Sequence, residues 1–248
     1  TTLSEANGNG IPQDWPARLT EISSRPPRSN CTISFAREFG CKKFGFCSKC
    51  ASKRSRYLES LKKYGVDTWF KLGDKDLATH IRRTQLLKDG KKLSDVTRSL
   101  SQSLGVQHII LPMSEKPIQT IVKTDQGELS FQEYFVKYQC APKVKKISNV
   151  GCETAEVPIY LKELINKNKL SGVIICPSNP YLSIDPILSI NEIKTFLLET
   201  DIPILAVSPI IANDSIKGPT SKIMREMNND PSVESIAQHY SELIDVLV

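Results

Sequence analysis

Two stretches of similar pattern decide the fold: GVIICPSNP at residues 172–180 and IPILAVSPI at residues 202–210. Each begins as an apolar run of strand length and reaches a proline next to Ser or Asn. Amphipathic patterns of helix length precede them, over residues 159–167 and 192–199. Apolar strands that alternate with helices predict a parallel sheet covered by helices on both faces. The predicted fold class is therefore α/β and Rossmann-like.

Outside these stretches, the sequence adds a helical and β-hairpin insertion. Asp74 suits the N-cap of a helix that runs to about Lys88, and Ser94 suits the N-cap of a second helix that ends at Gly105. Further helices are predicted over 57–64, 220–227 and 233–247, and further strands over 106–111, 118–123, 129–137 and 144–148. The run Asp125-Gln126-Gly127 between two of these strands is typical of a hairpin turn.

The composition bounds the class of protein. The chain has 248 residues, of which 40% are hydrophobic and 24% charged, so it can bury a core and is not a disordered polymer. Its longest nearly apolar run, 202–212, contains two prolines and falls short of the ~20 residues that a membrane span needs. Residues 1–10 show no apolar signal-peptide region. We therefore expect a cytoplasmic protein with reduced thiols and no membrane partner.

The formal net charge of +6 lies in the first quarter of the chain. Residues 1–63 hold twelve Lys and Arg against five Asp and Glu, whereas the other 185 residues hold 21 against 22. We therefore divide the chain into a basic leader over 1–56 and an α/β domain over 57–248. Gly and Pro within residues 1–30 predict an extended or poorly ordered arm.

Four cysteines of the leader are candidate zinc ligands. They have the spacing C-x9-C-x5-C-x2-C: Cys31, Cys41, Cys47 and Cys50. A structural zinc site usually shows two CxxC knuckles, and this leader has one. Phenylalanines interleave with the basic residues, a pattern that would also suit RNA. A solvated stretch with neither role is the interpretation we favour over both, and we do not expect a nucleic-acid partner.

The strand ends carry the first candidate site, because ligands of open parallel sheets bind beyond the carboxyl ends of the strands. Ser178 and Asn179 follow one decisive strand and Ser208 follows the other, so hydroxyl, amide and N–H groups are available to an anion. Lys217-Gly218-Pro219 leads into a predicted helix, whose free N–H groups would favour phosphate. Each feature alone would equally suit a tight turn. Together they favour a phosphate or nucleotide site.

A second polar group lies on the helix predicted after Gly73. Asp76, Thr79 or His80, and Arg83 are spaced so that they share one helix face. A carboxylate, an imidazole and a guanidinium on one face would suit a metal–phosphate group. The alternative is a solvated face with i,i+4 salt links, and periodicity does not separate the two.

Six runs, in this order, resemble those of the 2-phospho-L-lactate transferases, which make the deazaflavin coenzyme F-420. They are LGDKDLATH (72–80), LPMS (111–114), FQEYF (131–135), PSNP (177–180), SPII (208–211) and KGP (217–219). The resemblance covers about residues 57–248. It implies transfer of 2-phospho-L-lactate, or of enolpyruvyl phosphate in bacterial members, from a guanosine diphosphate donor to the ribityl hydroxyl of the deazaflavin Fo. GMP is released, Mg²⁺ assists, and homodimers are the family's expectation.

The resemblance also implies roles for single residues. Asp74 and Asp76 would hold magnesium, and His80 and Arg83 would complete the catalytic set near the diphosphate. The substrate-binding positions are the remaining matches: Lys75, Met113, Ser114, Gln132, Pro177, Ser178, Asn179, Ser208, Pro209, Lys217 and Gly218. Lys75 would contact the deazaflavin. The guanosine nucleotide would be lined by Ser178, Asn179, Ser208 and Lys217. Gln132 and Glu133 would lie on opposite faces of the predicted strand 129–137.

Several parts of the family pattern have no match, among them an Asn-Thr-x-Asp-Asp turn and a Ser-Pro-Asp-Leu-Asp segment. The family's first strand and its phosphate loop, Gly-Gly-Thr-Gly-Thr-Pro-Lys, are absent from residues 1–56. Because that strand belongs to the parallel sheet, we expect exposed sheet edge and apolar surface, and little or no activity of this chain on its own. The alternative function is a catalytically weak or inactive nucleotide-binding remnant with a Cys-rich zinc or nucleic-acid module.

Overall fold

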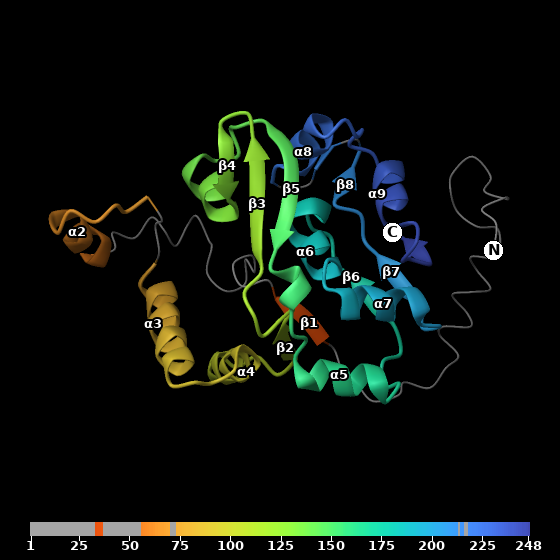
Figure 1. Ribbon diagram of the computed structural model, residues 1–248, viewed down its shortest axis with the longest axis horizontal. Coiled ribbons are helices and arrows are strands. Elements are labelled where there is room, and N and C mark those ends of the chain that lie inside the picture. Colours follow the sequence, from red (N-terminus) through yellow and green to blue (C-terminus); the bar gives the residue numbers. More distant parts are fainter. Residues whose placement is uncertain (1–32, 37–55, 70–72, 213, 216–217) are drawn as a thin grey trace.

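The computed structural model describes residues 33–36, 56–69, 73–212, 214–215 and 218–248 (Figure 1). The α-helices are α2 (Arg56–Lys63), α3 (Asp74–Lys88), α4 (Leu93–Ser103), α5 (Ile159–Asn166), α6 (Asp185–Leu188), α7 (Asn191–Glu199), α8 (Thr220–Glu226) and α9 (Val233–Tyr240). The strands are β1 (Ile33–Ala36), β2 (Ile109–Pro112), β3 (Gln119–Thr124), β4 (Gly127–Ser130), β5 (Val144–Val150), β6 (Val173–Ile175), β7 (Ile204–Ala206), β8 (Ile210–Ile211), β9 (Asp214–Ser215) and β10 (Val246–Leu247). Shorter helical turns are η2 (Glu133–Lys137), η3 (Cys152–Thr154) and η4 (Pro180–Ile184).

The two decisive stretches pair side by side in a parallel sheet of order β10-β7-β6. Helices connect these strands, as parallel pairing requires. Ile175, Ile204 and Ala206 are buried in the main core. The fold is α/β and Rossmann-like, as predicted.

A second parallel pair joins β1 to β2, with Ile33 opposite Ile109 and Ala36 opposite Pro112. Strand β1 therefore comes from the segment 1–56 that we predicted as a leader. The arm predicted over residues 1–30 lies outside the described residues. Helix α4 packs beside β2, and the Glu115 carboxylate accepts a hydrogen bond from the Ser94 N–H at 3.1 Å, which ties the start of α4 to the end of β2.

An antiparallel sheet of order β4-β3-β5 rises from the parallel strands in Figure 1. Asp125 and Gln126 make the predicted hairpin turn. The predicted strand 129–137 is wrong, because β4 ends at Ser130 and the chain turns into a helical segment that ends with η2. The Ser130 N–H and hydroxyl both donate to the Glu133 carboxylate, at 2.9 and 2.8 Å, and close that first turn.

Three predicted helix ends are also corrected. Gly73, not Asp74, is the N-cap of α3, and its N–H donates to the Asp76 carboxylate at 3.4 Å. Lys92, not Ser94, is the N-cap of α4. The predicted helix 233–247 ends at Tyr240, and the chain returns as β10, because the Asp245 N–H bonds the Ile204 carbonyl and begins a ladder along β7.

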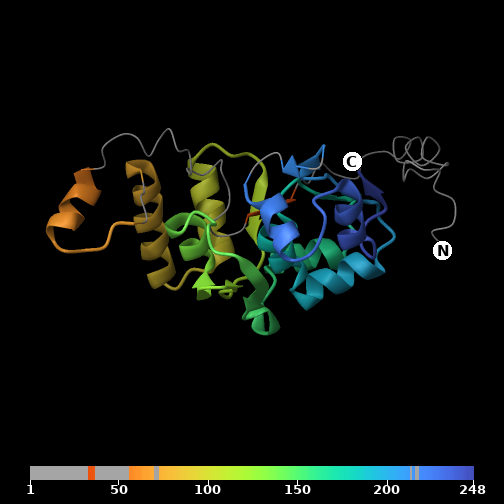
Figure 2. The same ribbon diagram turned by 90° about the horizontal axis from the view of Figure 1, so that it is seen from above.

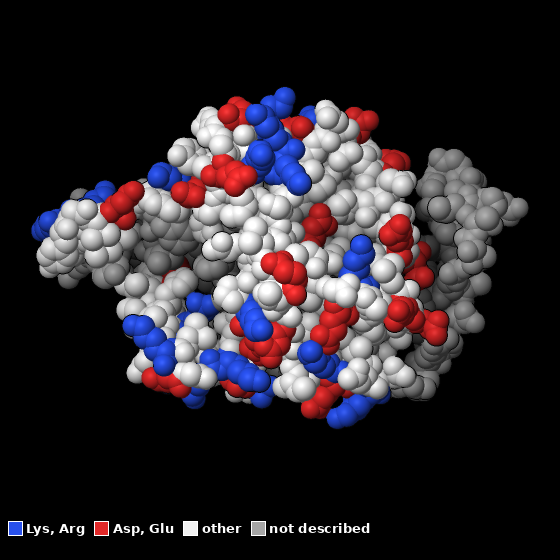
Figure 3. Space-filling model, in the orientation of Figure 1, with Lys and Arg blue, Asp and Glu red and all other residues white. Residues whose placement is uncertain are grey.

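Charged side chains of both signs are interspersed over most of the face shown in Figure 3. Basic side chains gather at the top of that view, over the ends of β3 and β5. Lys123 and Lys146 lie directly opposite each other there, and both are exposed. Among the described residues, no helix is long and apolar enough to cross a membrane.

Candidate functional site

The turn after β6 is built around the side chain of Asn179. Its Oδ1 accepts a hydrogen bond from the Leu182 N–H at 2.9 Å and so caps η4. That bond fixes the orientation of the amide, because the acceptor atom must be oxygen. The Nδ2 atom then points elsewhere, is buried, and has no hydrogen-bond partner among the residues that the structure describes. A buried donor without a partner is rare in folded proteins, and a bound water or ligand is the usual explanation.

The turn after β7 is buried and tightly hydrogen-bonded. The Ser208 Oγ accepts from the Ile210 N–H at 3.1 Å and lies 3.0 Å from the Ile210 carbonyl, and the Ser208 N–H donates to the Val248 carbonyl at 2.7 Å. Pro209 is buried beside it. Both polar groups of Ser208 are therefore used within the fold, and the residue supports the shape of the turn.

The chain continues from this turn through the small hairpin β8–β9 to α8. The Ser215 hydroxyl donates to the Gly218 carbonyl at 3.1 Å, and Gly218 has φ +79°, a conformation that favours glycine. The Ser215 N–H donates to the Asp214 carboxylate at 2.8 Å and lowers the pKa of Asp214. Lys217 lies outside the described residues.

Met113 and Ser114 follow β2 and are buried. The Ser114 Oγ accepts hydrogen bonds from the N–H groups of Lys116 and Glu156, both at 3.0 Å, and so ties the end of β2 to the segment before α5. Gln132 is half-buried in the helical turn that replaces the predicted strand, so the prediction that Gln132 and Glu133 lie on opposite strand faces is wrong. The two bonds from Ser130 lower the pKa of Glu133.

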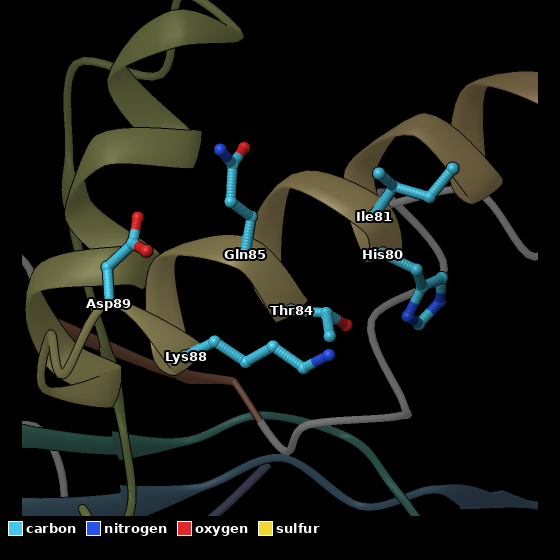
Figure 4. A pocket seen from close by; sticks show the side chains of 6 residues that line it. All are labelled: His80, Ile81, Thr84, Gln85, Lys88 and Asp89. Atoms are coloured by element: carbon cyan, nitrogen blue, oxygen red, sulfur yellow. The ribbon is translucent and has the colours of Figure 1, made fainter.

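On α3, Asp76, Thr79, His80 and Arg83 are each half-buried, and His80 lines a hollow with Thr84 and Lys88. Partial burial lowers the pKa of Arg83. Lys75 is exposed in the first turn, and the side chain of Asp74 is outside the described set. An open hollow of about 490 Å³ lies along this helix, and Figure 4 shows the side chains around it. It is lined by His80, Ile81, Thr84, Gln85, Lys88 and Asp89.

The sequence comparisons identify the family. The family profile for 2-phospho-L-lactate transferase CofD matches residues 45–248. The chain belongs to the 2-phospho-L-lactate transferase family. Over 190 residues it is 35% identical to the 2-phospho-L-lactate transferase of Methanosarcina mazei. That match covers 77% of this chain and 61% of the relative.

Other members of the family give similar values. The 2-phospho-L-lactate transferase of Methanopyrus kandleri is 37% identical over 74% of this chain and 58% of its own length. The phosphoenolpyruvate transferase of Streptomyces griseus is 36% identical over 75% of this chain and 60% of its own length. The chain thus spans about three fifths of the length of these curated relatives. The solved structure of protein BH3568 from Bacillus halodurans aligns over 67% of this chain and 50% of that chain, at 14% identity and a TM-score of 0.49.

The transferase motifs fall into two separated groups. The strand-end group comprises the turns after β6 and β7 and the segment that leads to α8. The helix group comprises the predicted residues of α3. Figures 1 and 2 share a horizontal long axis, and in both views α4 and β2 lie between α3 and β7 along that axis. In the part of the chain that the structure describes, α3 and the strand-end group therefore lie apart.

Sequence reasoning missed a polar cluster that packs behind the turn after β6. The His239 Nε2 lies 2.8 Å from the Asp185 Oδ1, and the Asn229 Nδ2 donates to the Tyr181 hydroxyl at 3.1 Å. The His239 ring meets that of Tyr181 edge-on, with centroids 5.1 Å apart. These residues come from η4, α6, α9 and the loop before α9. No local sequence signal joins positions so far apart.

The metal predictions have little support in the geometry. The four cysteines predicted for zinc, Cys31, Cys41, Cys47 and Cys50, lie outside the described residues. Within the described part of the chain, no group of three His, Cys, Asp or Glu side chains could hold a metal ion. Asp76 uses one carboxylate oxygen at the α3 cap. Magnesium commonly takes one or two carboxylates together with substrate phosphates and water, so a role of Asp76 in holding it stays a prediction.

Proposed function

We propose that this chain carries the nucleotide-binding part of a 2-phospho-L-lactate transferase. The reaction would transfer 2-phospho-L-lactate, or enolpyruvyl phosphate, from a guanosine diphosphate donor to the ribityl hydroxyl of the deazaflavin Fo, with release of GMP. Relatives of both names, a phospholactate and a phosphoenolpyruvate transferase, are 35% and 36% identical to this chain over the matched residues. Family membership supports the reaction class. The buried, unpartnered Nδ2 of Asn179 is the observation that carries the site.

This reaction requires the protein mainly to position the reacting groups and to stabilise negative charge. In phosphoryl-type transfer, catalysis rests on holding the groups in line and on stabilising charge on the phosphate oxygens. We infer that the Asn179 amide donates to the nucleotide and that Ser178 and Gly218 lie along it, while the buried Ser208 and Pro209 shape the adjoining turn. On α3, Lys75 and Arg83 would supply positive charge for the acceptor and the diphosphate, with His80 beside them. Magnesium, when bound, would neutralise the diphosphate.

The separation of the two groups supports a further part of the proposal. Donor and acceptor must meet within bonding distance, yet α3 and the strand-end group are held apart in this chain. We therefore infer that the chain alone turns over slowly or not at all. We also propose that the protein assembles as a homodimer. We further propose the cytoplasm as its compartment, in keeping with the free thiols of Cys140, Cys152 and Cys176.

The test separates the donor role of Asn179 from its role as a cap. Asn179→Asp keeps an oxygen for the Leu182 N–H but removes the Nδ2 donor and adds a negative charge. We expect the affinity for GDP, measured by calorimetry, to fall by about tenfold or more, which corresponds to about 1.4 kcal/mol per factor of ten. The matched control is Asn168→Asp, which adds the same charge at an exposed position. Equal affinities of the two variants would remove Asn179 from the site.

A parallel titration with Fo tests the alternative function. That alternative is a nucleotide-binding remnant without transfer. The observation that favours it is that the chain spans about three fifths of the length of its relatives. Binding of both GDP and Fo would support the transferase. Binding of GDP without Fo would support the remnant.

A further inference from the structure

The segment that follows Asn179 is a single π-helical turn, η4. The Asn179 carbonyl accepts from the Ser183 N–H at 3.0 Å, and the Asp185 N–H bonds the Pro180 carbonyl. Single π turns are rare, and many of those known lie at functional sites. Because one turn joins Asn179 to Asp185, a contact that holds Asp185 also limits the directions in which the Asn179 amide can point.

Two side-chain contacts hold η4 from other parts of the chain. At its end, the Asp185 Oδ1 lies 2.8 Å from the His239 Nε2 of α9. Within it, the Tyr181 hydroxyl accepts a hydrogen bond of 3.1 Å from the Asn229 Nδ2, which follows α8. The turn that carries Asn179 is therefore tied to the end of α8 and to α9.

The side chain of His239 is also held by ring packing. Its ring meets those of Tyr181 and Tyr240 edge-on, with centroids 5.1 and 4.9 Å apart, and both tyrosines are buried. The side chains of His239 and Asp185 are 25% and 31% exposed. Ion pairs with this exposure contribute little to the stability of a fold, so the main consequence of this contact is the position of Asp185.

We propose that His239 and Asp185 are positioning residues for the nucleotide site: together they fix η4, and with it the direction of the Asn179 Nδ2 donor. This inference rests on the proposed role of Asn179 in binding the nucleotide. A donor that is in place before its ligand arrives avoids the loss of affinity that comes with ordering it on binding. The bond between Asn229 and Tyr181 adds a second tie, from α8, the helix that follows the strand-end group.

The first test measures GDP binding by calorimetry with the full 248-residue chain. His239→Phe keeps a ring against Tyr181 and Tyr240 but removes the Nε2 atom that meets Asp185. We expect the affinity for GDP to fall roughly fivefold, the size of effect that one lost hydrogen bond has. His108→Phe is the matched control, because it makes the same change at an exposed position and should leave the affinity unchanged.

A conservative variant of the partner shows whether the hydrogen bond or the charge matters. Asp185→Asn keeps an oxygen that accepts from His239, whereas Asp185→Ala removes it. We expect Asp185→Ala to weaken GDP binding roughly fivefold and Asp185→Asn to restore it to within about twofold of the parent chain. Asp201→Ala removes the same charge at an exposed position and should have no effect.

A double-mutant cycle shows whether His239 acts through Asn179. Asn179→Asp keeps the cap on η4 but already lacks the Nδ2 donor, so adding His239→Phe should cause no further loss of GDP affinity. A residue that only supports the fold, or that contacts the nucleotide itself, would weaken binding by the same factor in both backgrounds.

Hydrogen exchange of the ligand-free chain gives a readout that does not depend on GDP. The Leu182 N–H bonds the Asn179 Oδ1 at 2.9 Å and reports on local opening of η4. We expect this amide to exchange roughly fivefold faster in His239→Phe and at the parent rate in His108→Phe.

The outcomes separate this inference from the proposed function. An unchanged Leu182 rate in His239→Phe, or equal losses of GDP affinity in the two backgrounds of the cycle, would overturn the positioning role and leave the nucleotide site in place. Equal losses in Asp185→Asn and Asp185→Ala would overturn it too. Equal GDP affinities of Asn179→Asp and Asn168→Asp would instead remove the proposed site, and this inference with it.

Discussion

The strand-end group and α3 both carry polar residues, but the two regions differ in how firmly the rest of the fold holds them. The turns after β6 and β7 are fixed by bonds to η4, Ile210 and Val248, and their neighbours Pro180, Tyr181 and Leu182 are buried. On α3, Leu86 is buried, but Ile81 is 60% exposed and the hollow along the helix is open. The strand ends are positioned by the core, and α3 is positioned mainly by its own backbone.

This difference bears on function. A binding group must be held in place before its ligand arrives, because ordering it on binding costs affinity. The strand-end group meets that condition within this chain. On α3, the bonds of Asp76 to the Gly73 N–H and of Thr79 to the Lys75 carbonyl stay within the helix and its cap, and they do not tie the helix to the core. The predictions below test this contrast through stability, from the largest expected effect to the smallest.

Removing one core side chain should separate the two regions most clearly. Ile236 on α9 is fully buried, and Ile236→Ala should lower the free energy of unfolding by about 2–5 kcal/mol. Ile81→Ala on α3 should change it by less than about 0.5 kcal/mol, because that side chain is mostly exposed. Urea denaturation measures both. Similar losses in the two variants would show that α3 is packed as firmly as the sheet.

Helix caps offer a smaller test of the same contrast. Asn179→Ala removes the acceptor for the Leu182 N–H, a bond of 2.9 Å within a half-buried turn, and should cost about 1 kcal/mol. Asp76→Ala removes the longer bond of 3.4 Å to the Gly73 N–H, and should cost a few tenths of a kcal/mol at most. The measurement is again the urea midpoint. A larger loss for Asp76 would reverse the ranking of the two regions.

Much of the fold and part of the site could be predicted from sequence. Apolar runs such as 172–176 and 202–208 overlap β6 and β7, because strand periodicity and proline stops are local signals. The segment after Ser130 was mispredicted because its aromatic residues suit a strand, whereas the bonds from Ser130 to Glu133 start a helical turn. Strand β10 and the contact of His239 with Asp185 depend on partners distant in sequence, which a local pattern does not reveal.

The same limit applies to the candidate site. The motifs placed Asn179 and Ser208 at strand ends correctly, since strand polarity alone decides that. They gave no indication that the Ser208 hydroxyl would be used by its own turn, while the Asn179 amide would keep one donor without a partner. Nor could they show that α3 would lie apart from the strands, because that depends on how the insertion folds.

Alkaline pH provides the last test, because ionisable groups are buried beside the sheet. Cys140 and Tyr134 are buried together, with the Cys140 N–H bonded to the Tyr134 carbonyl at 2.8 Å. Burial raises the pKa of the Cys140 thiol from about 9 to about 11, and it also raises the pKa of Tyr134. Between those two values the folded state holds the thiol proton and the unfolded state releases it. The free energy of unfolding should therefore fall as the pH rises from about 9 to about 11.

The variant Cys140→Ser removes this titration while keeping a side chain of similar size. Its urea midpoint should fall less steeply than that of the parent chain over the same pH range, although the Tyr134 contribution remains in both. Cys176→Ser is the matched control, because it makes the same change at an exposed position outside the buried core. If all three proteins lost stability at the same rate, Cys140 would not be held protonated by burial. The core beside the strand-end group would then be open to water, and the contrast with α3 would be smaller than the packing indicates.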